Sequence, residues 1–446
     1  MAVIENITTP IDSFIVDEEI NASGLASVGR ATIRELVALV NRIEARSGQS
    51  YIRMEMGVPG LEAPSIGIEA EIAALHRGVA SKYPMLEGIP PLKKEISRFC
   101  SQFLNIKVDS QNCFPTVGSA QGAFATFLVA NRTKNGAGTL FIDPGFPNQK
   151  RQLEVIGQHW GSFDVYTHRG EKLREALEEH LSTGRYTTLL YSNPNNPSWI
   201  CFSEQELAII AEVADKYGVI VIEDLAYFGM DYREDYSRPG EAPYQPSVAH
   251  FTDNYVLLIS SSKVFSYAGQ RVASLVVSDR LAARDFPALK PVFGQSNYGK
   301  ALLFGALHSL SSGVTHSAQY GLAALLKSAN DGDLPFLNQV RVYEERARKM
   351  KQLLLENGFE LVYAEDQGRA LGDGFYFTFY YPGMESDELV ETLLHYGISA
   401  LSLSGTGSER SEGLRACVSQ ISDEMFPILE ERLKAFHHDA SARQAT

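Results

Sequence analysis

Lys263 stands close behind an apolar run, where an ammonium group is costly to bury. The run is Val256 to Ser260 (VLLIS), and the lysine follows it by three residues. A desolvated lysine has a lowered pKa, and its amine can form a Schiff base with a carbonyl group. The hydroxyl of Ser260 and the guanidinium of Arg271, eight residues after the lysine, are both suited to binding phosphate. A surface loop with an incidental lysine is the alternative for this segment alone.

Asp224 ends a second apolar run, Val219 to Asp224 (VIVIED). A buried carboxylate needs a partner, and a pyridinium nitrogen would be a suitable one. An aspartate there keeps such a ring protonated, so that the ring can accept electrons in carbanion chemistry. Tyr227, three residues further on, could reach a hydroxyl on the same ring. An aspartate that caps a helix, beside a tyrosine that only packs, is the alternative for this segment.

Two further segments could hold other parts of the same ligand. The turn sequence NPNNP at 193–197 follows a strand-like run, and Asn196 could donate its amide to a ring hydroxyl. Asn-Pro pairs are also common in ordinary turns. A glycine turn at Gly118 opens an apolar helix. The free N–H groups and the dipole of that helix favour a phosphate at Ser119 and Ala120.

Short apolar runs alternate with helical stretches from about residue 110 onward. The runs are Leu140 to Asp143, Thr187 to Ser192, Val219 to Asp224, Val256 to Ser260 and Ala273 to Ser278. Unbroken β-branched runs of this kind predict buried parallel strands with helices on both faces, and hence an α/β sheet. Ligands of such sheets bind beyond the carboxyl ends of the strands, which is where the polar residues above lie.

The length of 446 residues predicts more than one domain. We expect an N-terminal segment at 1–60 that joins the small domain, a large domain at 61–330, and a small C-terminal α+β domain at 331–446. Helical spacing predicts helices over 24–47 and 335–357, the second closed by Gly358. Residues 54–60 are expected to form a loop, and Gly374 to Tyr381 a strand.

Composition narrows the possible functions. The net charge of −14, without any Lys/Arg run, argues against nucleic-acid binding. No stretch of about 18 apolar residues predicts a membrane span, and the acidic Met1 to Ile20 segment does not resemble a signal peptide. The cysteines are far apart, and neither they nor the histidines have metal-ligand spacing, so we expect no metal site and no disulfide. We therefore expect a cytoplasmic protein with buried thiols.

Taken together and in this order, the segments resemble the class I/II aminotransferases of the aspartate-aminotransferase superfamily, the fold type I pyridoxal-phosphate (PLP) enzymes. The resemblance runs from about Gly57 to Arg415. It rests on the elements Asn-Asn-Pro, Asp-x-x-Tyr and Ser-x-Ser-Lys…Gly-x-Arg. It implies a three-layer large domain around a mostly parallel sheet, a smaller α+β domain, and pyridoxal 5'-phosphate as cofactor. The implied reaction is a ping-pong transfer of an amino group from an amino acid to a 2-oxo acid.

The resemblance also implies a role for each residue around the cofactor. Lys263 would form the internal aldimine and shuttle the proton, and Asp224 would pair with the pyridine nitrogen. Tyr227 and Asn196 would hold the phenolic oxygen of the ring. The phosphate would be held at the Gly118 turn by Ser119, Ala120, Ser260 and Arg271.

Four more positions follow from the same resemblance. Phe146, in the sequence DPGFP, would stack on the ring face, and Tyr83, in YPMLEG, would reach the phosphate of a neighbouring subunit. The role of Tyr83 implies a homodimer with shared active sites. Arg415 would grip the substrate α-carboxylate bidentately, beside Gly57 and Asn196.

The chain departs from the family pattern at three places. Trp199 stands where the family usually has glycine, so the wall of the site or its turn should change. Ala273 replaces another usual glycine, which is a milder change. The segment 229–246 is longer than the family norm; it either narrows substrate access or is a solvent-exposed insertion.

Three other functions remain open at this point. The same scaffold can run β-elimination at a carbon–sulfur bond or a γ-elimination, because one carbanion serves all these reactions. A PLP-binding sensor would need a basic DNA-binding domain, but only about 50 residues precede Gly57, and they are not basic. A structural protein without ligand is the third. The amino donor and acceptor cannot be inferred from the sequence.

Overall fold

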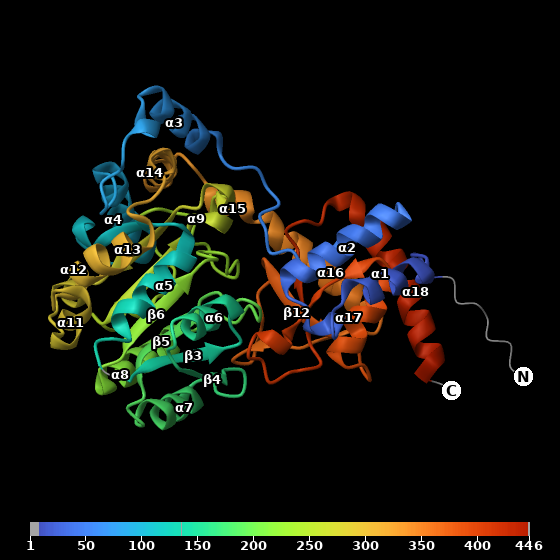
Figure 1. Cartoon of the computed structure of the whole chain (residues 1–446). Coiled ribbons are helices and arrows are strands. Elements are labelled where there is room, and N and C mark those ends of the chain that lie inside the picture. Colours follow the sequence, from blue (N-terminus) through green and yellow to red (C-terminus); the bar gives the residue numbers. More distant parts are fainter. Residues whose placement is uncertain (1–8, 135, 445–446) are drawn as a thin grey trace, which may run out of the picture.

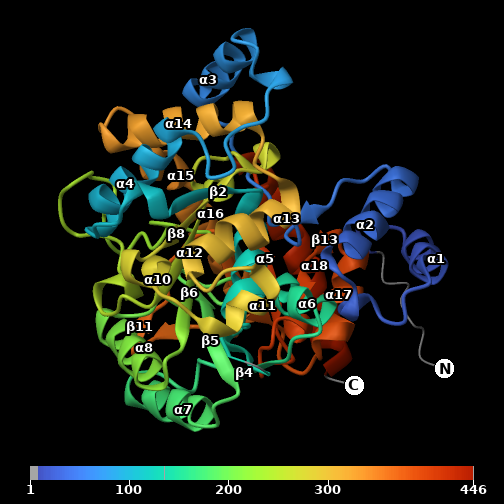
Figure 2. The same cartoon turned by 60° about the vertical axis from the view of Figure 1, so that its left-hand side comes forward.

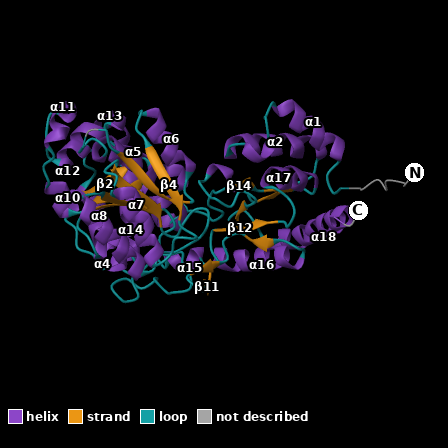
Figure 3. Ribbon diagram, turned by 90° about the horizontal axis from the view of Figure 1, so that it is seen from below, coloured by secondary structure: helices purple, strands orange, loops and turns teal. Residues whose placement is uncertain are grey.

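The computed structural model describes residues 9–134 and 136–444. The described part forms two lobes, with the N-terminal helices lying on the C-terminal lobe (Figure 1). Figure 3 shows the strands of the two lobes as separate groups joined by loops. The first eight residues of the predicted 1–60 segment lie outside the described residues, and the domain limits at residues 60 and 330 stay predictions.

A seven-stranded sheet forms the centre of the large lobe, in the order β2-β8-β7-β6-β5-β3-β4. The strands are β2 (Cys113–Thr116), β3 (Gly138–Asp143), β4 (Trp160–Asp164), β5 (Tyr186–Ser192), β6 (Ile220–Leu225), β7 (Tyr255–Ser260) and β8 (Ala273–Val277). Only β8 runs antiparallel to its neighbours, so the sheet is mostly parallel. The predicted α/β fold and its five buried apolar strands are confirmed. The prediction that all five are parallel was wrong for Ala273 to Ser278, because an apolar run indicates burial on both faces and not strand direction, and β8 is antiparallel.

Both faces of this sheet are buried, which explains why its strands are apolar without alternation. Side chains such as Leu189, Val221 and Leu257 belong to one core, and Leu190, Ile222 and Leu258 belong to a second. Helix α5 (Gly118–Ala130) covers the second face and packs against β7 and β8. The other longer helices of this lobe are α4 (Pro90–Leu104), α6 (Pro147–Val155), α7 (Glu171–Leu181), α8 (Glu204–Tyr217) and α14 (His316–Asn330).

Helix α3 (Ser65–His76) packs on α14 and projects from the top of the large lobe (Figure 2). Short helical segments complete this lobe: α9 (Ser261–Val264), α10 (Asp279–Ala283), α11 (Lys290–Phe293), α12 (Tyr298–Lys300), the π-helical turn Ala301–Leu307 and α13 (His308–Ser311). The first of these is important for function because it follows β7 directly and carries Lys263.

The small lobe is built on a four-stranded antiparallel sheet in the order β14-β15-β12-β9. Its strands are β9 (Glu360–Leu361), β12 (Tyr376–Tyr380), β14 (Leu401–Ser402) and β15 (Leu414–Cys417), and its longer helices are α16 (Val342–Glu356), α17 (Ser386–His395) and α18 (Phe426–Gln444). The N-terminal helices α1 (Ser13–Ser23) and α2 (Ile33–Ser47) lie beside them. Strand β1 (Ile52–Arg53) pairs in parallel with β13 (Ile398–Ser399), which fixes the following loop.

The two lobes are tied by polar contacts along one edge. Asp366, in the hairpin of β10 (Glu365–Asp366) and β11 (Arg369–Ala370), forms ion pairs with Arg169 at 2.5 Å and Arg233 at 2.8 Å. Arg233 belongs to the long 229–246 segment, in which Tyr232 and Tyr236 are buried. This segment therefore joins the lobes, and it is not simply a solvent-exposed insertion.

Two sequence predictions about helices were wrong in detail. The helix expected over 24–47 begins only at Ile33, because Gly24 ends α1 in the left-handed region and Thr32 caps α2 by accepting from the Glu35 amide. The helix expected over 335–357 is interrupted at Arg341, giving α15 (Phe336–Val340) and α16. Gly358 does close it, with φ of +80°.

Within residues 9–134 and 136–444, no helix combines the length and the apolar character that crossing a bilayer requires. The same residues contain no cluster of three or more His, Cys, Asp or Glu side chains arranged to hold a metal ion.

Candidate active site

A pocket with a volume of about 470 Å³ lies beyond the carboxyl ends of β5, β6 and β7, where the lobes meet. Nearly all the predicted catalytic and substrate-binding side chains face it. It is lined by Ile33, Val37, Met56, Gly57, Val58, Ser119, Phe146, Ser192, Asn196, Asp224, Ala226, Tyr227, Ser260, Ser262, Lys263, Tyr376 and Arg415. The sheet register explains part of this set, since Ser192 on β5 pairs directly with Asp224 on β6.

Lys263 lies in the short helix α9, at the rim of the sheet. The hydroxyl of Ser260 caps this helix and accepts from the amide of Ser262 at 3.1 Å. The Lys263 ammonium group donates to the carbonyl oxygen of Gly57, which reaches it from the other lobe. Burial lowers the pKa of this ammonium group to about 8, and the nearby positive charges of Arg415 and Arg271 act in the same direction. The lysine is thus held in the desolvated state that makes an amine nucleophilic near neutral pH.

Asp224 has one satisfied and one unsatisfied carboxylate oxygen. Its Oδ2 accepts from the side-chain amide of Gln149 at 2.8 Å. Its Oδ1 is buried and makes no hydrogen bond to the described residues. Burial raises the pKa of Asp224 to about 6, while Gln149 and the amide of Ala226 lower it. A buried acceptor without a partner fits the cationic nitrogen of a pyridinium ring.

Arg415 is held from two sides beneath the pocket. It lies on β15, and its guanidinium carbon is 4.6 Å from the centre of the Tyr376 ring. One of its terminal nitrogens donates to the backbone oxygen of Glu55 at 2.6 Å, whereas its buried Nε has no partner among the described residues. A fixed guanidinium with a free donor fits a carboxylate group.

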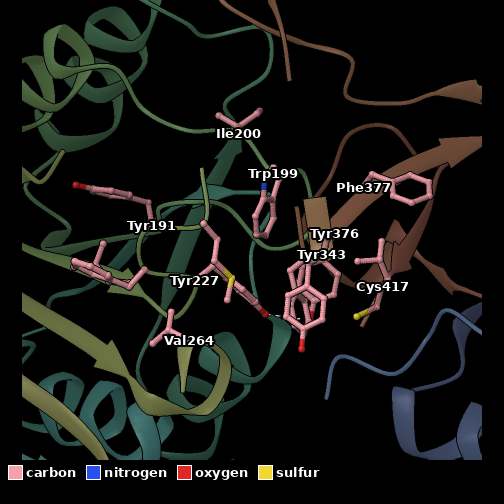
Figure 4. Packing of buried hydrophobic residues seen from close by; sticks show 14 of the residues in the cluster. Tyr191, Trp199, Ile200, Tyr227, Val264, Tyr343, Tyr376, Phe377 and Cys417 are labelled. Atoms are coloured by element: carbon pink, nitrogen blue, oxygen red, sulfur yellow. Dashed lines mark hydrogen bonds between the residues drawn. The ribbon is translucent and has the colours of Figure 1, made fainter. Parts of the chain in front are cut away.

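The hydroxyl of Tyr227 donates to the hydroxyl of Tyr376 at 3.0 Å. Figure 4 shows the two rings meeting between the large lobe and β12. Burial raises the pKa of the Tyr227 hydroxyl well above its usual range, so it stays protonated and can donate a hydrogen bond. The sequence reasoning missed Tyr376; the only signal was its place in an aromatic-rich strand.

A cradle for an anion lies at the start of α5. Gly118 has φ of +68°, and a Cβ atom there would lie 2.3 Å from a terminal nitrogen of Arg271. The guanidinium therefore sits against the first turn of α5, where backbone N–H groups are free. Ser119 and Ser260 line the pocket beside it, and so does Ser262, which the sequence reasoning did not select. Gly118, Ala120 and Arg271 border this cradle without lining the pocket itself.

The turn after β5 is braced against β3. The side-chain amide of Asn195 donates to the carbonyl of Pro144 at 2.7 Å, and the hydroxyl of Ser192 accepts from the amide of Asn196 at 3.2 Å. These bonds fix Asn196 on the pocket wall, while Phe146, at the N-terminus of α6, forms another part of it. Gln149 lies four residues after the Asp143-Pro144-Gly145 segment, and the sequence reasoning missed it because no motif marks it.

Trp199 lies behind the pocket wall and does not line it. Its ring is buried and packs edge-on against Tyr227 and Tyr376, with centroid distances of 5.5 and 6.3 Å (Figure 4). The residue has φ of +64°, so the turn keeps the left-handed geometry that glycine adopts easily. The ring fills the space against Gly374, where a Cβ atom would come within 2.2 Å of it. Tryptophan in place of the family's usual glycine therefore alters the packing behind Tyr227 and Tyr376, and not the pocket wall itself.

Two predicted features lie outside this pocket. Tyr83 is 91% exposed and does not contact the pocket of its own chain. The 229–246 segment lines a separate hollow of about 610 Å³, together with Cys201 and Asp366, and contributes nothing to the pocket walls. The expectation that this segment narrows substrate access is not supported by its position.

Comparison with known proteins agrees with this geometry. The family model described as aminotransferase class I and II matches residues 53–433. The chain is 23% identical over 333 residues to a probable aspartate aminotransferase of Methanocaldococcus jannaschii, covering 74% of this chain and 77% of that protein. It is 26% identical over 306 residues to a probable aspartate/prephenate aminotransferase of Aquifex aeolicus, covering 68% and 70%. The crystal structure of an aspartate aminotransferase from Thermotoga maritima superposes with a TM-score of 0.74 at 18% identity, covering 94% and 99%.

The chain belongs to the class I and II aminotransferases, and its fold is that of the fold type I enzymes. It is an aminotransferase that uses pyridoxal 5'-phosphate as its cofactor, with amino acids and 2-oxo acids as substrates. The relatives named above are aminotransferases and not lyases, so the elimination reactions gain no support.

Proposed function

We propose that this enzyme moves an amino group between an amino acid and a 2-oxo acid in two half-reactions, with Lys263 as the residue that carries the cofactor. The single observation that carries the proposal is the convergence of three groups on one pocket. These are the desolvated amine of Lys263, the unpaired Oδ1 of Asp224 and the unpaired Nε of Arg415. The cofactor and the substrate would supply the partners that the Asp224 and Arg415 atoms lack, and the cofactor would also supply the carbonyl group with which the Lys263 amine reacts.

When bound, pyridoxal phosphate supplies a carbonyl carbon that accepts the amino group and a protonated ring that takes up electrons from the substrate α-carbon. Nζ of Lys263 then removes the α-proton, which a desolvated amine with a pKa near 8 can do at physiological pH. Asp224 keeps the ring nitrogen protonated. The hydrogen bond from Gln149 holds its carboxylate in place for this task.

The remaining residues orient the ligands. Tyr227 and Asn196 would donate hydrogen bonds to the ring hydroxyl, and Phe146 would cover the ring face. Arg415 would bind the substrate α-carboxylate beside Gly57. Ser119, Ala120, Ser260 and Arg271 at the Gly118 turn would hold the phosphate, with Ser262 as an additional hydroxyl.

We further propose a homodimer in which Tyr83 reaches the partner's phosphate site. Support comes from α3, where four large apolar side chains are at least 38% exposed: Ile66, Ile68, Ile72 and Leu75. Tyr83 and Met85 continue this exposed apolar region along the chain. Large apolar side chains that are exposed in this number favour a protein contact on this part of the lobe.

A cytoplasmic location is also part of the proposal. All four cysteines are unpaired, and three of them, Cys100, Cys113 and Cys417, are buried. Free thiols persist in reducing compartments. The net charge of −14 leaves little basis for binding nucleic acid.

The test is to load the purified enzyme with pyridoxal phosphate, reduce it with borohydride, and map the modified peptide. Cofactor should be fixed to Lys263, and Lys263→Ala protein should retain none. Lys93→Ala is the matched control, because burial also lowers the pKa of the Lys93 ammonium group to about 8 but this lysine lies outside the pocket. Label on another lysine, or full amino transfer by Lys263→Ala protein, would contradict the proposal.

A further inference from the structure

Each charged side chain that lines the pocket already has a role in the proposed reaction. Among the described lining residues they are Asp224, Lys263 and Arg415. The first two act on the cofactor and the third binds the α-carboxylate. No lining cation is left for a second carboxylate on the substrate. Within this chain, the side chain of the substrate therefore meets uncharged groups.

The pocket wall opposite the sheet is apolar and comes from α2. Ile33 and Val37 are separated by one helical turn, so both lie on the same face of α2. They are half-buried and line the pocket, whereas Leu36, Leu39, Val40 and Ile43 form the buried face of the same helix. This helix thus has a second apolar strip that is not used for packing its own lobe.

The loop after β1 extends this apolar wall with Met56 and Val58. It is fixed to the small lobe, because the Cys417 amide donates to the carbonyl of Met54 at 2.7 Å and Gln420 donates to that of Pro59 at 3.0 Å. Arg415 itself binds the carbonyl of Glu55, the residue just before Met56. A substrate gripped by Arg415 would consequently have its side chain close to these apolar groups.

The arginines adjacent to this wall in sequence, Arg30, Arg34 and Arg53, do not line the pocket. Arg53 forms ion pairs with Glu44 at 3.0 Å and Glu55 at 2.6 Å. Arg30 pairs with Asp387 at 3.5 Å on the outer side of α2. An acidic side chain would lose hydration against the wall, and the described lining cations of this chain, Lys263 and Arg415, already have other roles in the proposed reaction.

We infer that the amino donor carries an apolar side chain, of the aliphatic or aromatic kind, that packs against Ile33, Val37 and Val58. This inference rests on the proposed function, since it assumes that Arg415 holds the α-carboxylate. Several relatives are named aspartate aminotransferases, and the name describes the substrate of those proteins. The donor class inferred for this chain is different.

The experiment follows the cofactor spectrum in single half-reactions, with leucine, methionine and phenylalanine compared with aspartate and glutamate. Apolar donors should react with kcat/KM about 10-fold higher or more, the discrimination that apolar pocket contacts provide. A higher kcat/KM for aspartate or glutamate would overturn the inference, and would also show that a partner subunit supplies the missing cation. If no amino acid reacts, the proposed function itself fails, and the inference fails with it.

Substitutions in the apolar wall test whether Ile33 and Val37 cause the preference for apolar donors. Ile33→Ala and Val37→Ala should lower kcat/KM for leucine and phenylalanine by about 10-fold and leave alanine as donor nearly unchanged. Val155→Ala, at a position 68% exposed on α6, is the matched control and should change none of these values. An equal loss with alanine would mean that the wall is only structural, which would overturn the inference.

A binding measurement without turnover provides a second readout. 3-Phenylpropanoate and succinate both offer a carboxylate to Arg415, but only the first has an apolar tail. The loaded enzyme should be stabilised against thermal unfolding more by 3-phenylpropanoate than by succinate at equal concentration. Val37→Arg should reverse this order, because it places a cation in the wall. The opposite order in the parent protein would overturn the inference.

Discussion

The hydroxyl groups of Tyr227 and Tyr376 lie 3.0 Å apart and form a hydrogen bond across the junction of the two lobes. Tyr227 follows β6 of the large sheet, and Tyr376 begins β12 of the small one. The ring of Tyr376 also lies against the guanidinium of Arg415. The residue proposed for the cofactor and the residue proposed for the substrate are therefore positioned by the same side chain.

Tyr376→Phe should test this link. The change removes the acceptor of the Tyr227 hydrogen bond but keeps the ring under Arg415. Loss of a buried hydrogen-bond partner should lower the free energy of unfolding by about 1 to 3 kcal/mol. The absorption spectrum of the bound cofactor should also change its pH dependence, because Tyr227 is reoriented. Tyr380→Phe, at a mostly solvent-accessible hydroxyl on the same strand, is the control. An unchanged titration of the cofactor spectrum would show that the tyrosine pair has only a packing role.

Arg415→Lys should weaken substrate binding more than it slows turnover. Lysine keeps the positive charge but cannot offer the paired donors of a guanidinium. The KM for amino donors should rise by about 10- to 100-fold, which corresponds to one lost charge-assisted hydrogen bond of about 1.5 to 3 kcal/mol. Steady-state kinetics measure this, with Arg410→Lys as a control in the neighbouring loop, where Arg410 pairs with Glu412. Equal KM values for Arg415→Lys and the parent enzyme would rule out the carboxylate role.

Capture of the cofactor should depend on pH through Lys263. Burial lowers the pKa of its ammonium group to about 8, and only the neutral amine can attack a carbonyl carbon. The rate at which cofactor-free enzyme binds pyridoxal phosphate covalently should therefore rise as pH increases through about 8 and level off above it. Stopped-flow absorbance with the cofactor-free protein measures this rate. A midpoint near 10.5, the ordinary value for lysine, would show that the amine is not desolvated in solution.

Gln149→Leu should shift the pH range in which the enzyme retains its cofactor. The hydrogen bond from Gln149 lowers the pKa of Asp224, so its loss should raise that pKa further above the value of about 6. The carboxylate that pairs with the ring nitrogen is lost when Asp224 is protonated on acidification. Cofactor affinity should thus fall at a higher pH in Gln149→Leu than in the parent, as equilibrium dialysis across pH 5 to 8 would show. Gln352→Leu, at an exposed position on α16, is the control; identical acid limbs in all three proteins would contradict the prediction.

The strands and the residues at their ends could be predicted from the sequence. Buried parallel strands are continuous apolar runs, so a polar residue such as Asp224 or Lys263 at the end of one is conspicuous. Gln149 and Tyr376 could not be found in this way. Gln149 lies on a helix and Tyr376 in the other lobe, and only the tertiary arrangement brings them to Asp224 and Tyr227.

Helix α2 shows a related limit. Its buried face was visible as helical spacing of Leu36, Val37, Val40 and Ile43, but that pattern does not separate packing residues from pocket-lining ones. Leu36, Val40 and Ile43 are buried in the core, whereas Val37 lines the pocket. The helix begins later than predicted, because the glycines at 24 and 29 disfavour helix and Thr32 with Glu35 forms a capping box before Ile33.

The contact between Trp199 and Gly374 has a consequence for the history of this branch of the family. The indole ring occupies the volume that any side chain at 374 would need, since a Cβ atom there would lie 2.2 Å from the ring. The side chains at positions 199 and 374 therefore compete for the same volume at the junction of the lobes. Relatives with glycine at the position of Trp199 are free to carry a larger residue opposite, so these two sites should covary, large against small, when related sequences are aligned.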